Sequence, residues 1–484
     1  MYAETPDIIP FTSPFHVDLL TPAQLQTLQE GTLRLLDEVG VHFPSRRALA
    51  ILADHGAHVD HEAQIVRIPP DLVRRAMARA PRSFVLGGRE ERLDMVLDGQ
   101  RAYLCTDGTG VHVVDPETRE VRPSCKEDIA RVARVCDALP MVSFFWPPVS
   151  AQDYGQTAPL HQCHAGLTNT LKHVRGAMTI DPALAPYAVE MATAVAGSEA
   201  ARRARPPICA NICTIAPLAQ DGPGIESALV YAAAGIPTSF MAMPTMGSTA
   251  PATPLGALVV GDAEVVSMMV LVQLAYPGAP VFHSIIASLM DPRTGGYIGE
   301  VPAPLPLMAA QLAHAWGVPS LGGGTLSTDA PELGWQAGVE GGFGGAAIPL
   351  FGSEICGFLG LTGGAMTLYP EKLILDHEIC RSAYDALGEF EFDPADMALD
   401  VVRAVGPRGH FLAQDHTRRR IRDFRLSRVL RQRNEAGVPR DPRDVAQEEF
   451  RRLEATHRPE PLPPEVLAEL DRIMEAAERE TYKK

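Results

Sequence analysis

The sequence predicts an α/β protein of the (β/α)₈ TIM-barrel class, with an N-terminal helical preface and a C-terminal helical extension. Eight short β-rich runs recur after about residue 100, at starts roughly 30–45 residues apart, and the segments between them carry apolar residues at helical spacing. Such units repeated over about 280 residues are typical of a barrel, whose usual length is about 250 residues. An open doubly wound sheet is the alternative, but no G-x-G-x-x-G motif opens a helix after the first strand.

The preface is predicted to span residues 1–95 and to pack on the barrel. The segment TPAQLQTLQEGTLRLLDEVGV at 21–41 starts with a threonine cap and keeps leucine at helical spacing. The segment PPDLVRRAMARA at 69–80 opens with prolines, which the first turn of a helix tolerates. Both segments therefore predict helices.

The barrel is predicted over residues 96–385. Its eight strands are expected in the runs YLCTDG (103–108), VSFFWPPV (142–149), HVRGAMTI (173–180), ICANICTI (208–215), PTSFMAMPT (237–245), PVFHSIIAS (280–288), VPSLGGGTL (318–326) and AAIPLFGS (346–353). The extension, residues 386–484, is charged and rich in arginine before it becomes helical again. It is read either as a solvated helical tail packed on the barrel or as a surface that docks a partner.

Composition narrows the class of protein. The net charge of −16 argues against a nucleic-acid or anionic-membrane surface and leaves a cationic substrate or simple solubility. The N-terminus lacks the pattern of a signal peptide, and no run reaches about 18 uninterrupted apolar residues, so we expect a cytoplasmic protein without a membrane span. Eight scattered cysteines fit reduced thiols, and no disulfides are expected.

The residues that follow the strands are the candidates for function, because reactive groups in such barrels lie on loops at the carboxyl ends of the strands. Asp329 follows a glycine-rich strand end, where backbone can approach a ligand, although it equally fits the N-cap of the next helix. The other strand-end candidates include Asp107, Thr109, Trp146, Asp291, Arg293, Tyr297 and Glu354.

Metal and nucleophile motifs are weak in this sequence. No G-x-S-x-G, H-E-x-x-H or C-x-x-C motif is present. The pair Cys209 and Cys213 and the cluster His161, Cys163 and His164 lack a second pair at zinc-site spacing, so buried thiols are favoured and no tightly bound metal is expected.

Several segments together resemble the trimethylamine methyltransferase superfamily, and the resemblance covers nearly the whole chain. They are TPAQLQTLQEGTLRLLDEVGVHF at 21–43, MPTMGSTAPATPLG at 243–256, GVPSLGGGTLSTDAPELGWQAGVE at 317–340, EKLILDHEI at 371–379 and GHFLAQDHT at 409–417. The resemblance implies a barrel enzyme that moves a methyl group from a methylated amine to the Co(I) of a separate corrinoid (cobalamin) protein. That protein is expected to dock at the C-terminal face of the barrel, and a homo-oligomer is expected.

The loop at 327–336 matches the place where the founding members of that superfamily carry pyrrolysine. This sequence continues through Asp329, Ala330 and Pro331 without interruption, so it resembles the non-pyrrolysine branch, whose members demethylate quaternary amines such as betaines. A quaternary amine leaves as a neutral tertiary amine and needs no general acid, so positioning and desolvation are the main tasks of the protein.

A trimethylammonium group is held by aromatic faces, helped by a carboxylate. The candidate cage residues are Trp146, Tyr297, Trp335 and Phe343, and the candidate catalytic residues are Asp329, Glu354 and His283. Further substrate contacts are expected from Asp291, Arg293 and Thr109, with Arg293, His283 or loop amides available for a substrate carboxylate.

Two other functions remain open from the sequence. A barrel lyase or aldolase acting on a small carbonyl substrate needs a Schiff-base lysine, and Lys172 lies before the third predicted strand rather than after one. A non-catalytic methylamine-binding protein would keep the same barrel without turnover.

Overall fold

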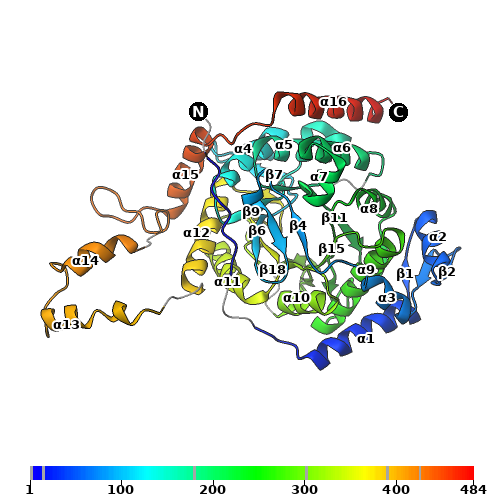
Figure 1. Ribbon diagram of the computed structural model, residues 1–484, viewed down its shortest axis with the longest axis horizontal. Helices are drawn as coiled ribbons and strands as arrows, with labels where there is room; N and C mark the ends of the chain where they lie inside the picture. The colour runs from blue at the N-terminus through cyan, green and yellow to red at the C-terminus, as the bar shows by residue number, and fades with distance from the viewer. Residues whose placement is uncertain are drawn as a thin grey trace.

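The computed structural model describes residues 4–12, 17–177, 181–299, 304–387, 392–424 and 427–483. Its centre is a closed ring of eight parallel strands with helices around it (Figure 1), which confirms the predicted barrel. The strands are β6 (Tyr103–Thr106), β9 (Val142–Phe145), β10 (His173–Ala177), β11 (Ile208–Ile215), β13 (Thr238–Ala242), β15 (Val281–Ile285), β18 (Leu321–Thr325) and β19 (Ile355–Leu359).

The ring closes because every strand pairs with both neighbours in the parallel sense. β19 pairs with β6, with Ile355 opposite Tyr103, and a parallel bridge between His283 and Ser320 joins β15 to the start of β18. All eight carboxyl ends therefore point to one face of the molecule, where the loops that follow them meet.

An outer layer of helices follows the strands in order. These helices are α4 (Lys126–Asp137), α5 (Ala158–Asn169), α6 (Ala185–Ala196), α7 (Glu199–Ala204), α8 (Gly222–Ala234), α9 (Pro254–Ala275), α10 (Leu305–Ala315), α11 (Trp335–Phe351) and α12 (Pro370–Leu387). Within the described residues, α9 alone is long and apolar enough to cross a membrane, but 78% of its most apolar window is buried inside the protein. It is therefore a core helix of the barrel.

The predicted eighth strand is wrong. The run at 346–353 forms the end of α11 and the turn after it, and the eighth strand is β19, whose sequence ICGFL was not recognised. A short apolar run fits a buried strand or a buried helix equally well, because periodicity does not separate the two. The last three residues of the third predicted strand, 178–180, lie outside the described residues.

The preface wraps the side and the amino-terminal end of the barrel. Its helices are α1 (Pro22–Glu38), α2 (Arg46–Asp54) and α3 (Pro70–Met77), and its strands are β1 (Val41–His42), β2 (His58–Asp60), β3 (Ile65–Arg67), β4 (Phe84–Leu86) and β5 (Met95–Leu97). The capping box at Thr21 fixes the start of α1 as its sequence predicts. Leu86, Met95 and Leu97 join the apolar cluster inside the barrel, so the β4–β5 hairpin fills that interior from its closed end.

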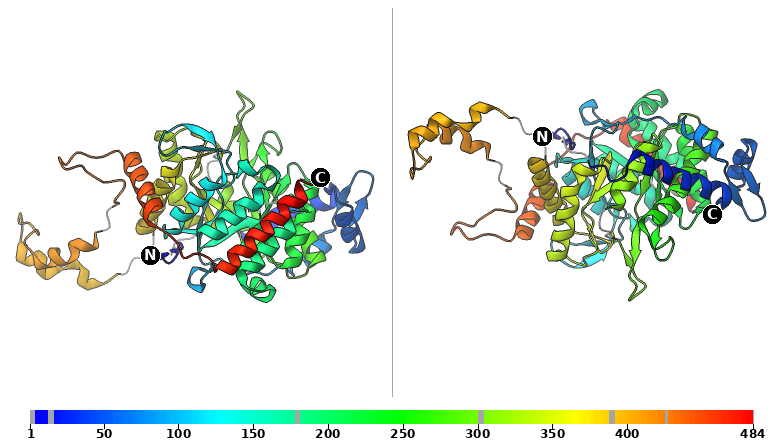
Figure 2. Two further views of the ribbon diagram at one scale, coloured as in Figure 1. Left: turned by 90° about the horizontal axis from the view of Figure 1, so that it is seen from above. Right: turned by 90° about the horizontal axis from the view of Figure 1, so that it is seen from below.

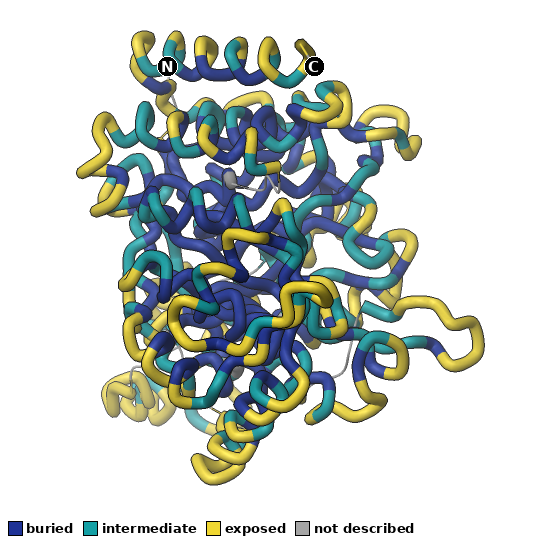
Figure 3. Tube along the Cα trace, turned by 90° about the vertical axis from the view of Figure 1, so that its right-hand side faces the viewer, coloured by how far each residue is buried: buried dark blue, intermediate teal, exposed yellow. Residues whose placement is uncertain are grey.

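The extension has two parts. The helices α15 (Pro442–Thr456) and α16 (Pro464–Thr481) pack on the body, and Figure 3 shows α16 buried along one face and exposed along the other. Between α12 and α15 the chain leaves the body and carries α13 (Leu399–Val405) and α14 (Asp415–Arg420) away from it, as both views in Figure 2 show.

Two small sheets surround the carboxyl-terminal face. One joins β20 (Leu361–Thr362), β21 (Thr367–Leu368), β7 (His112–Val114) and β8 (Val121–Pro123), and the other joins β14 (Thr245–Met246), β16 (Ser288–Met290) and β17 (Tyr297–Ile298).

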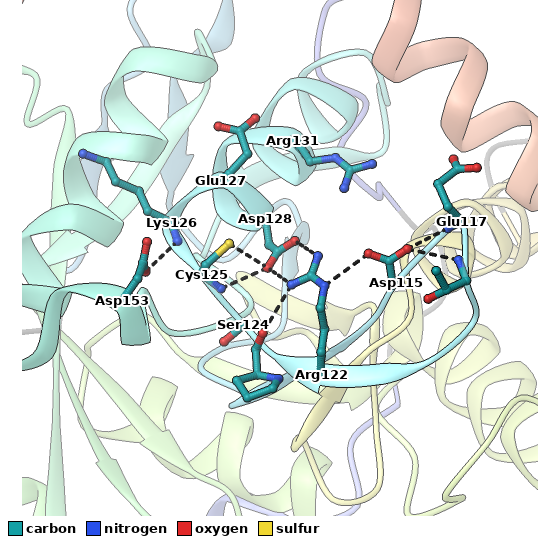
Figure 4. Close-up of polar contacts among 12 residues, drawn as sticks. Asp115, Glu117, Arg122, Ser124, Cys125, Lys126, Glu127, Asp128, Arg131 and Asp153 are labelled. Carbon is teal, nitrogen blue, oxygen red and sulfur yellow. Dashed lines mark hydrogen bonds and ion pairs between the residues drawn. The ribbon is translucent and has the colours of Figure 1, made fainter.

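A network of charges ties the β7–β8 hairpin to α4 (Figure 4). Arg122 donates two hydrogen bonds of 2.8 Å to the carboxylate of Asp128 and one of 3.1 Å to Asp115. The same Asp128 accepts from the backbone N–H of Cys125 and so caps α4. Burial opposes ionisation of Asp128, but these hydrogen bonds hold its pKa below the ordinary value.

Replacing Arg122 by glutamine should lower the free energy of unfolding at neutral pH by about 1–2 kcal/mol, because Asp128 stays buried without its bidentate partner. The loss should be fully present above the ordinary aspartate pKa of about 4 and should fade as acid protonates Asp128. Urea unfolding at several pH values measures it. The control is Arg74→Gln, since Arg74 pairs with Asp71 in solvent, and an equal effect of both changes would contradict the role given to Asp128.

Candidate functional site

A cavity of about 170 Å³ opens at the carboxyl-terminal face of the barrel. Its wall is largely apolar, with Met241, Met243, Ile285 and Phe358 among the lining side chains. The wall comes from the ends of several strands and the loops after them, so the closure of the ring brings together residues that are far apart in the sequence.

Asp107, the first residue after β6, lines this cavity and is 6% exposed. Its Oδ1 accepts a 2.9 Å hydrogen bond from the N–H of Gly108, while its Oδ2 accepts none within the part of the chain that the structure describes. Burial raises the pKa of Asp107 to about 7, although the nearby Ser327 side chain and the N–H of Gly108 act in the opposite direction. A cation placed in the cavity would favour the charged carboxylate.

Asp329 also lines the cavity, as the sequence suggested for the loop after the seventh strand. Its Oδ1 accepts from the N–H of Gly299 at 3.1 Å, and its own N–H donates to Glu340 of α11 at 3.2 Å. The alternative role of Asp329 as a helix cap is wrong, because α11 begins six residues later with Gly334 at its N-cap. Two carboxylates from opposite ends of the barrel sequence therefore meet at one cavity.

Trp146 is 4% exposed and forms part of the cavity wall. The hydroxyl of Thr106 accepts from the N–H of Trp146 at 2.8 Å and donates to its carbonyl at 2.5 Å, which fixes the backbone there. Gly108 lies against the indole so closely that a Cβ on it would come within 2.1 Å of Nε1, so this position requires glycine.

The guanidinium of Arg175 lies 4.1 Å from the centre of the Trp146 ring and supports it from inside the barrel. Arg175 is fully buried among Phe144 and Phe282, and its Nε and Nη1 have no hydrogen-bond partner within the described ranges. Arg175 was not among the predicted site residues, although a lone arginine inside the apolar run HVRGA was a signal that could have found it.

Tyr297, at the start of β17, completes the aromatic part of the wall near the mouth and is 57% exposed. Of the residues predicted for the site, the structure thus brings together Trp146, Tyr297 and Asp329. Asp107, noted in the sequence as a strand-end residue, joins them.

The predicted catalytic residues His283 and Glu354 lie elsewhere. His283 points away from the barrel interior, and its Nε2 lies 2.8 Å from Asp262 of α9. Glu354 was expected to follow the eighth strand, but it immediately precedes β19. It therefore lies at the amino-terminal end of the barrel, opposite the cavity. There it accepts from the N–H of Ser320 at 2.8 Å and pairs with His314 at 3.1 Å.

The remaining predicted contacts do not line the cavity either. Trp335 and Phe343 of α11 are 91% and 63% exposed, so they do not complete an aromatic cage. Asp291 and Arg293 pair with each other in the β16–β17 hairpin, and the Thr109 hydroxyl is buried without a partner in the described structure. The expected donors for a substrate carboxylate, Arg293 and His283, are thus both away from the cavity.

Within the described ranges, no group of three or more histidine, cysteine or acidic side chains is placed to hold a metal ion. Cys209 belongs to the apolar cluster inside the barrel, and Cys163 is buried in α5. His161 is held by Lys126 at 3.0 Å and by Glu478 at 2.8 Å, so it serves the packing of α16.

The buried carboxyl of Asp107 predicts a dependence of stability on pH. Its pKa is higher in the folded protein than in the unfolded chain, so its stabilising contribution is present at acid pH and is lost as the pH rises to about 7. The free energy of unfolding of Asp107→Asn, taken relative to that of the wild type, should therefore be higher at pH 8 than at pH 5 by about 1–4 kcal/mol. Thermal unfolding at both pH values measures the gain, and a difference that does not change with pH would contradict the assignment.

The sequence comparisons with known proteins match most of the chain. A family model described as trimethylamine methyltransferase (MTTB) matches residues 7–481. A trimethylamine methyltransferase, MttB, of Desulfitobacterium hafniense (strain DSM 10664 / DCB-2) is 32% identical over 94% of this chain and 93% of its own length. A glycine betaine methyltransferase of Desulfitobacterium hafniense (strain Y51) is 29% identical over 83% of this chain and 84% of its own length.

Among solved structures, the monomethylamine methyltransferase MtmB of Methanosarcina barkeri aligns with 97% of this chain and 88% of its own, at 12% identity and a TM-score of 0.45. The sequence matches to the family model and to MttB span nearly the full length of the chain. The chain therefore belongs to the trimethylamine methyltransferase family.

Proposed function

We propose that the protein transfers a methyl group from a small quaternary ammonium compound, such as a trimethylammonium carboxylate of the betaine type, to the Co(I) of a corrinoid carried by a separate protein. Membership of the family supports a methyltransferase, and the relative named as a glycine betaine methyltransferase supports a quaternary substrate. We also propose that the protein acts in the cytoplasm.

This proposal depends on one observation. Two carboxylates, Asp107 and Asp329, and two aromatic side chains, Trp146 and Tyr297, line the same apolar cavity. A trimethylammonium group spreads its charge over methyl groups that donate no strong hydrogen bonds. Aromatic faces attract such a cation by about 0.5–2 kcal/mol each, and nearby carboxylates add a Coulombic attraction that the low dielectric of a buried site strengthens.

The chemistry asks little of the protein beyond placement. The corrinoid, when present at the mouth, supplies the nucleophile that accepts the methyl group, and the tertiary amine leaves neutral. The side chains of the cavity hold the ammonium group, orient one methyl group toward the mouth and keep water away from it. The loop at 327–334 contributes Asp329 rather than a reactive group, which is consistent with a substrate that already has a good leaving group.

The rim of the cavity fits a large partner group. Met243 and Tyr297 line the cavity and are 44% and 57% exposed, so the mouth presents an apolar edge to solvent. Such an edge suits the flat face of a corrinoid brought by its carrier protein.

The alternative function, a lyase or aldolase that forms a Schiff base on a lysine, has little support in the position of Lys172. The Nζ of Lys172 donates to three backbone carbonyls, of Cys136, Leu139 and Val142, at 2.6–2.8 Å and lies before β10, away from the mouth. Borohydride trapping of a carbonyl substrate on a lysine would revive this alternative. Tight binding of a betaine without methyl transfer to any corrinoid protein would favour the non-catalytic alternative.

Asp107→Asn and Asp329→Asn should each lower kcat/KM for a trimethylammonium substrate by about 10–100-fold, which corresponds to about 1.4–2.7 kcal/mol. The amide keeps the size of the side chain and removes the attraction for the cation. Formation of methylated corrinoid, followed by its absorption spectrum, gives the rate.

The matched control for these variants is Glu332→Gln, which changes an exposed carboxylate three residues beyond Asp329 that does not line the cavity. It should keep the wild-type rate. Full activity of both cavity variants would show that the carboxylates do not bind the substrate.

A further inference from the structure

Arg175 is a positively charged side chain in the interior of the barrel, on β10, and it is fully buried. Its Nη2 donates a 3.4 Å hydrogen bond to the hydroxyl of Ser239. Its Nε and Nη1 have no hydrogen-bond partner within the described part of the chain. A buried charged group normally has partners for its donors, because burial removes the water that would otherwise solvate it. Two unsatisfied donors on a fully buried guanidinium therefore indicate a role for Arg175 beyond packing.

The described neighbours of the guanidinium offset its charge only in part. The ring centres of Phe144, Trp146 and Phe282 lie 5.5, 4.1 and 5.8 Å from its Cζ, and aromatic rings offset part of the cost of burying a cation. Burial raises the pKa of the neighbouring Cys105 thiol to about 12, so this thiol is neutral at physiological pH. A guanidinium stays protonated in proteins, so Arg175 brings a positive charge into the barrel.

Arg175 lies one side chain behind the wall of the cavity. The indole of Trp146, on which the guanidinium packs, lines the cavity, whereas Arg175 itself does not. A charge in this position acts on a bound molecule through the protein interior, whose low dielectric weakens electrostatic attraction much less than water does. Arg175 is therefore a source of positive potential at the inner side of the cavity.

The two carboxylates of the cavity lie nearer the mouth. Asp107 directly follows β6 and Asp329 follows β18, whereas Arg175 lies within β10, so both carboxylates are closer to the carboxyl-terminal face. In the ring of eight strands, β10 is four strands from β18, which places these two strands opposite each other. The cavity thus has negative groups near its mouth and a positive group behind its inner wall.

This arrangement of charges fits a zwitterion in one orientation. Asp107 and Asp329 attract an ammonium group, and Arg175 attracts a carboxylate on the same molecule. A carboxylate turned toward the mouth would instead lie beside two negative groups. The charges therefore favour the orientation in which the methyl groups face the mouth, where the methyl acceptor arrives under the proposed function.

We propose that Arg175 is a positioning residue that selects a quaternary ammonium substrate with a carboxylate and turns that carboxylate toward the interior of the barrel. This inference rests on the proposed function, in which the ammonium group binds beside Asp107 and Asp329. Arg175 acts across the indole of Trp146 and does not touch the substrate. It supplies the positive charge that the sequence analysis expected from Arg293, which pairs with Asp291 instead.

Calorimetric titration of the full chain at pH 8 with glycine betaine and with its primary amide tests this proposal. The two compounds have nearly the same shape and the same ammonium group, but the amide has no negative charge. The wild type should bind glycine betaine at least about 10-fold more tightly than the amide. Arg175→Met replaces the guanidinium with an apolar chain that suits the surrounding aromatic rings, and it should bring the two affinities close to each other.

The effect on the amide separates a role in positioning from a role in packing. Removal of a positive charge should leave the binding of the cationic amide unchanged or strengthen it, while the binding of glycine betaine weakens. A packing defect at Arg175 would weaken the binding of both compounds, keep their ratio and contradict the proposal.

Arg202→Met is the matched control, because Arg202 is also a buried arginine but lies on α7 outside the ring of strands, where it donates to the carbonyl of Ala234 at 3.0 Å. It should keep the wild-type ratio of affinities. A wild type that binds both compounds equally, or an Arg175→Met variant that keeps the wild-type ratio, would overturn the inference and leave the proposed function intact. A wild type that binds neither compound would overturn the proposed function and the inference with it.

Discussion

The hydrogen bonds between β19 and β6 are the constraint on which the rest of the structure depends. They join the last strand of the ring to the first, with Ile355 opposite Tyr103 and Cys356 opposite Leu104, and so turn a sheet into a barrel. Closure places Asp107, which follows the first strand, near Asp329, which follows the seventh. In an open sheet these two residues would lie at separate edges, and no common cavity would form.

The cavity that results is costly for the folded state. Asp107 is buried, and its Oδ2 has no hydrogen-bond partner among the residues that the structure describes. Burial raises its pKa to about 7, so the charged form is disfavoured without a ligand. A carboxylate held in this condition gains when a cation arrives, because the cation replaces the hydration that burial removed. The buried carboxylate of Asp107 thus lowers the stability of the ligand-free protein and favours the binding of a cation.

The fold was largely predictable, because the alternation of β-rich and helical segments reflects the architecture directly. The eighth strand was predicted wrongly, because the apolar run at 346–353 forms the end of a helix and the turn after it. As a result, Glu354 was expected at the carboxyl-terminal face, although it lies at the amino-terminal end of β19. His283 was assigned without regard to the alternation of side chains along a strand, which turns Phe282 inward and His283 toward α9.

The site was predictable where it depends on strand ends and not where it depends on three-dimensional packing. Trp146, Tyr297 and Asp329 follow their strands and line the cavity, whereas Trp335 and Phe343 have the right chemistry on a helix face that points to solvent. Arg175 was missed because the search for site residues considered the loops after the strands, and Arg175 lies within a strand. The roles of all these residues in the reaction remain predictions.

The most direct test of the account is the affinity of the cavity for a fixed positive charge. Isothermal titration calorimetry at pH 8 can compare a trimethylammonium carboxylate with the compound in which carbon replaces the nitrogen, since the two have nearly the same shape. The ammonium compound should bind at least about 30-fold more tightly, corresponding to about 2 kcal/mol, and Asp107→Asn should reduce this difference in affinity. Equal affinities for the two compounds would contradict it.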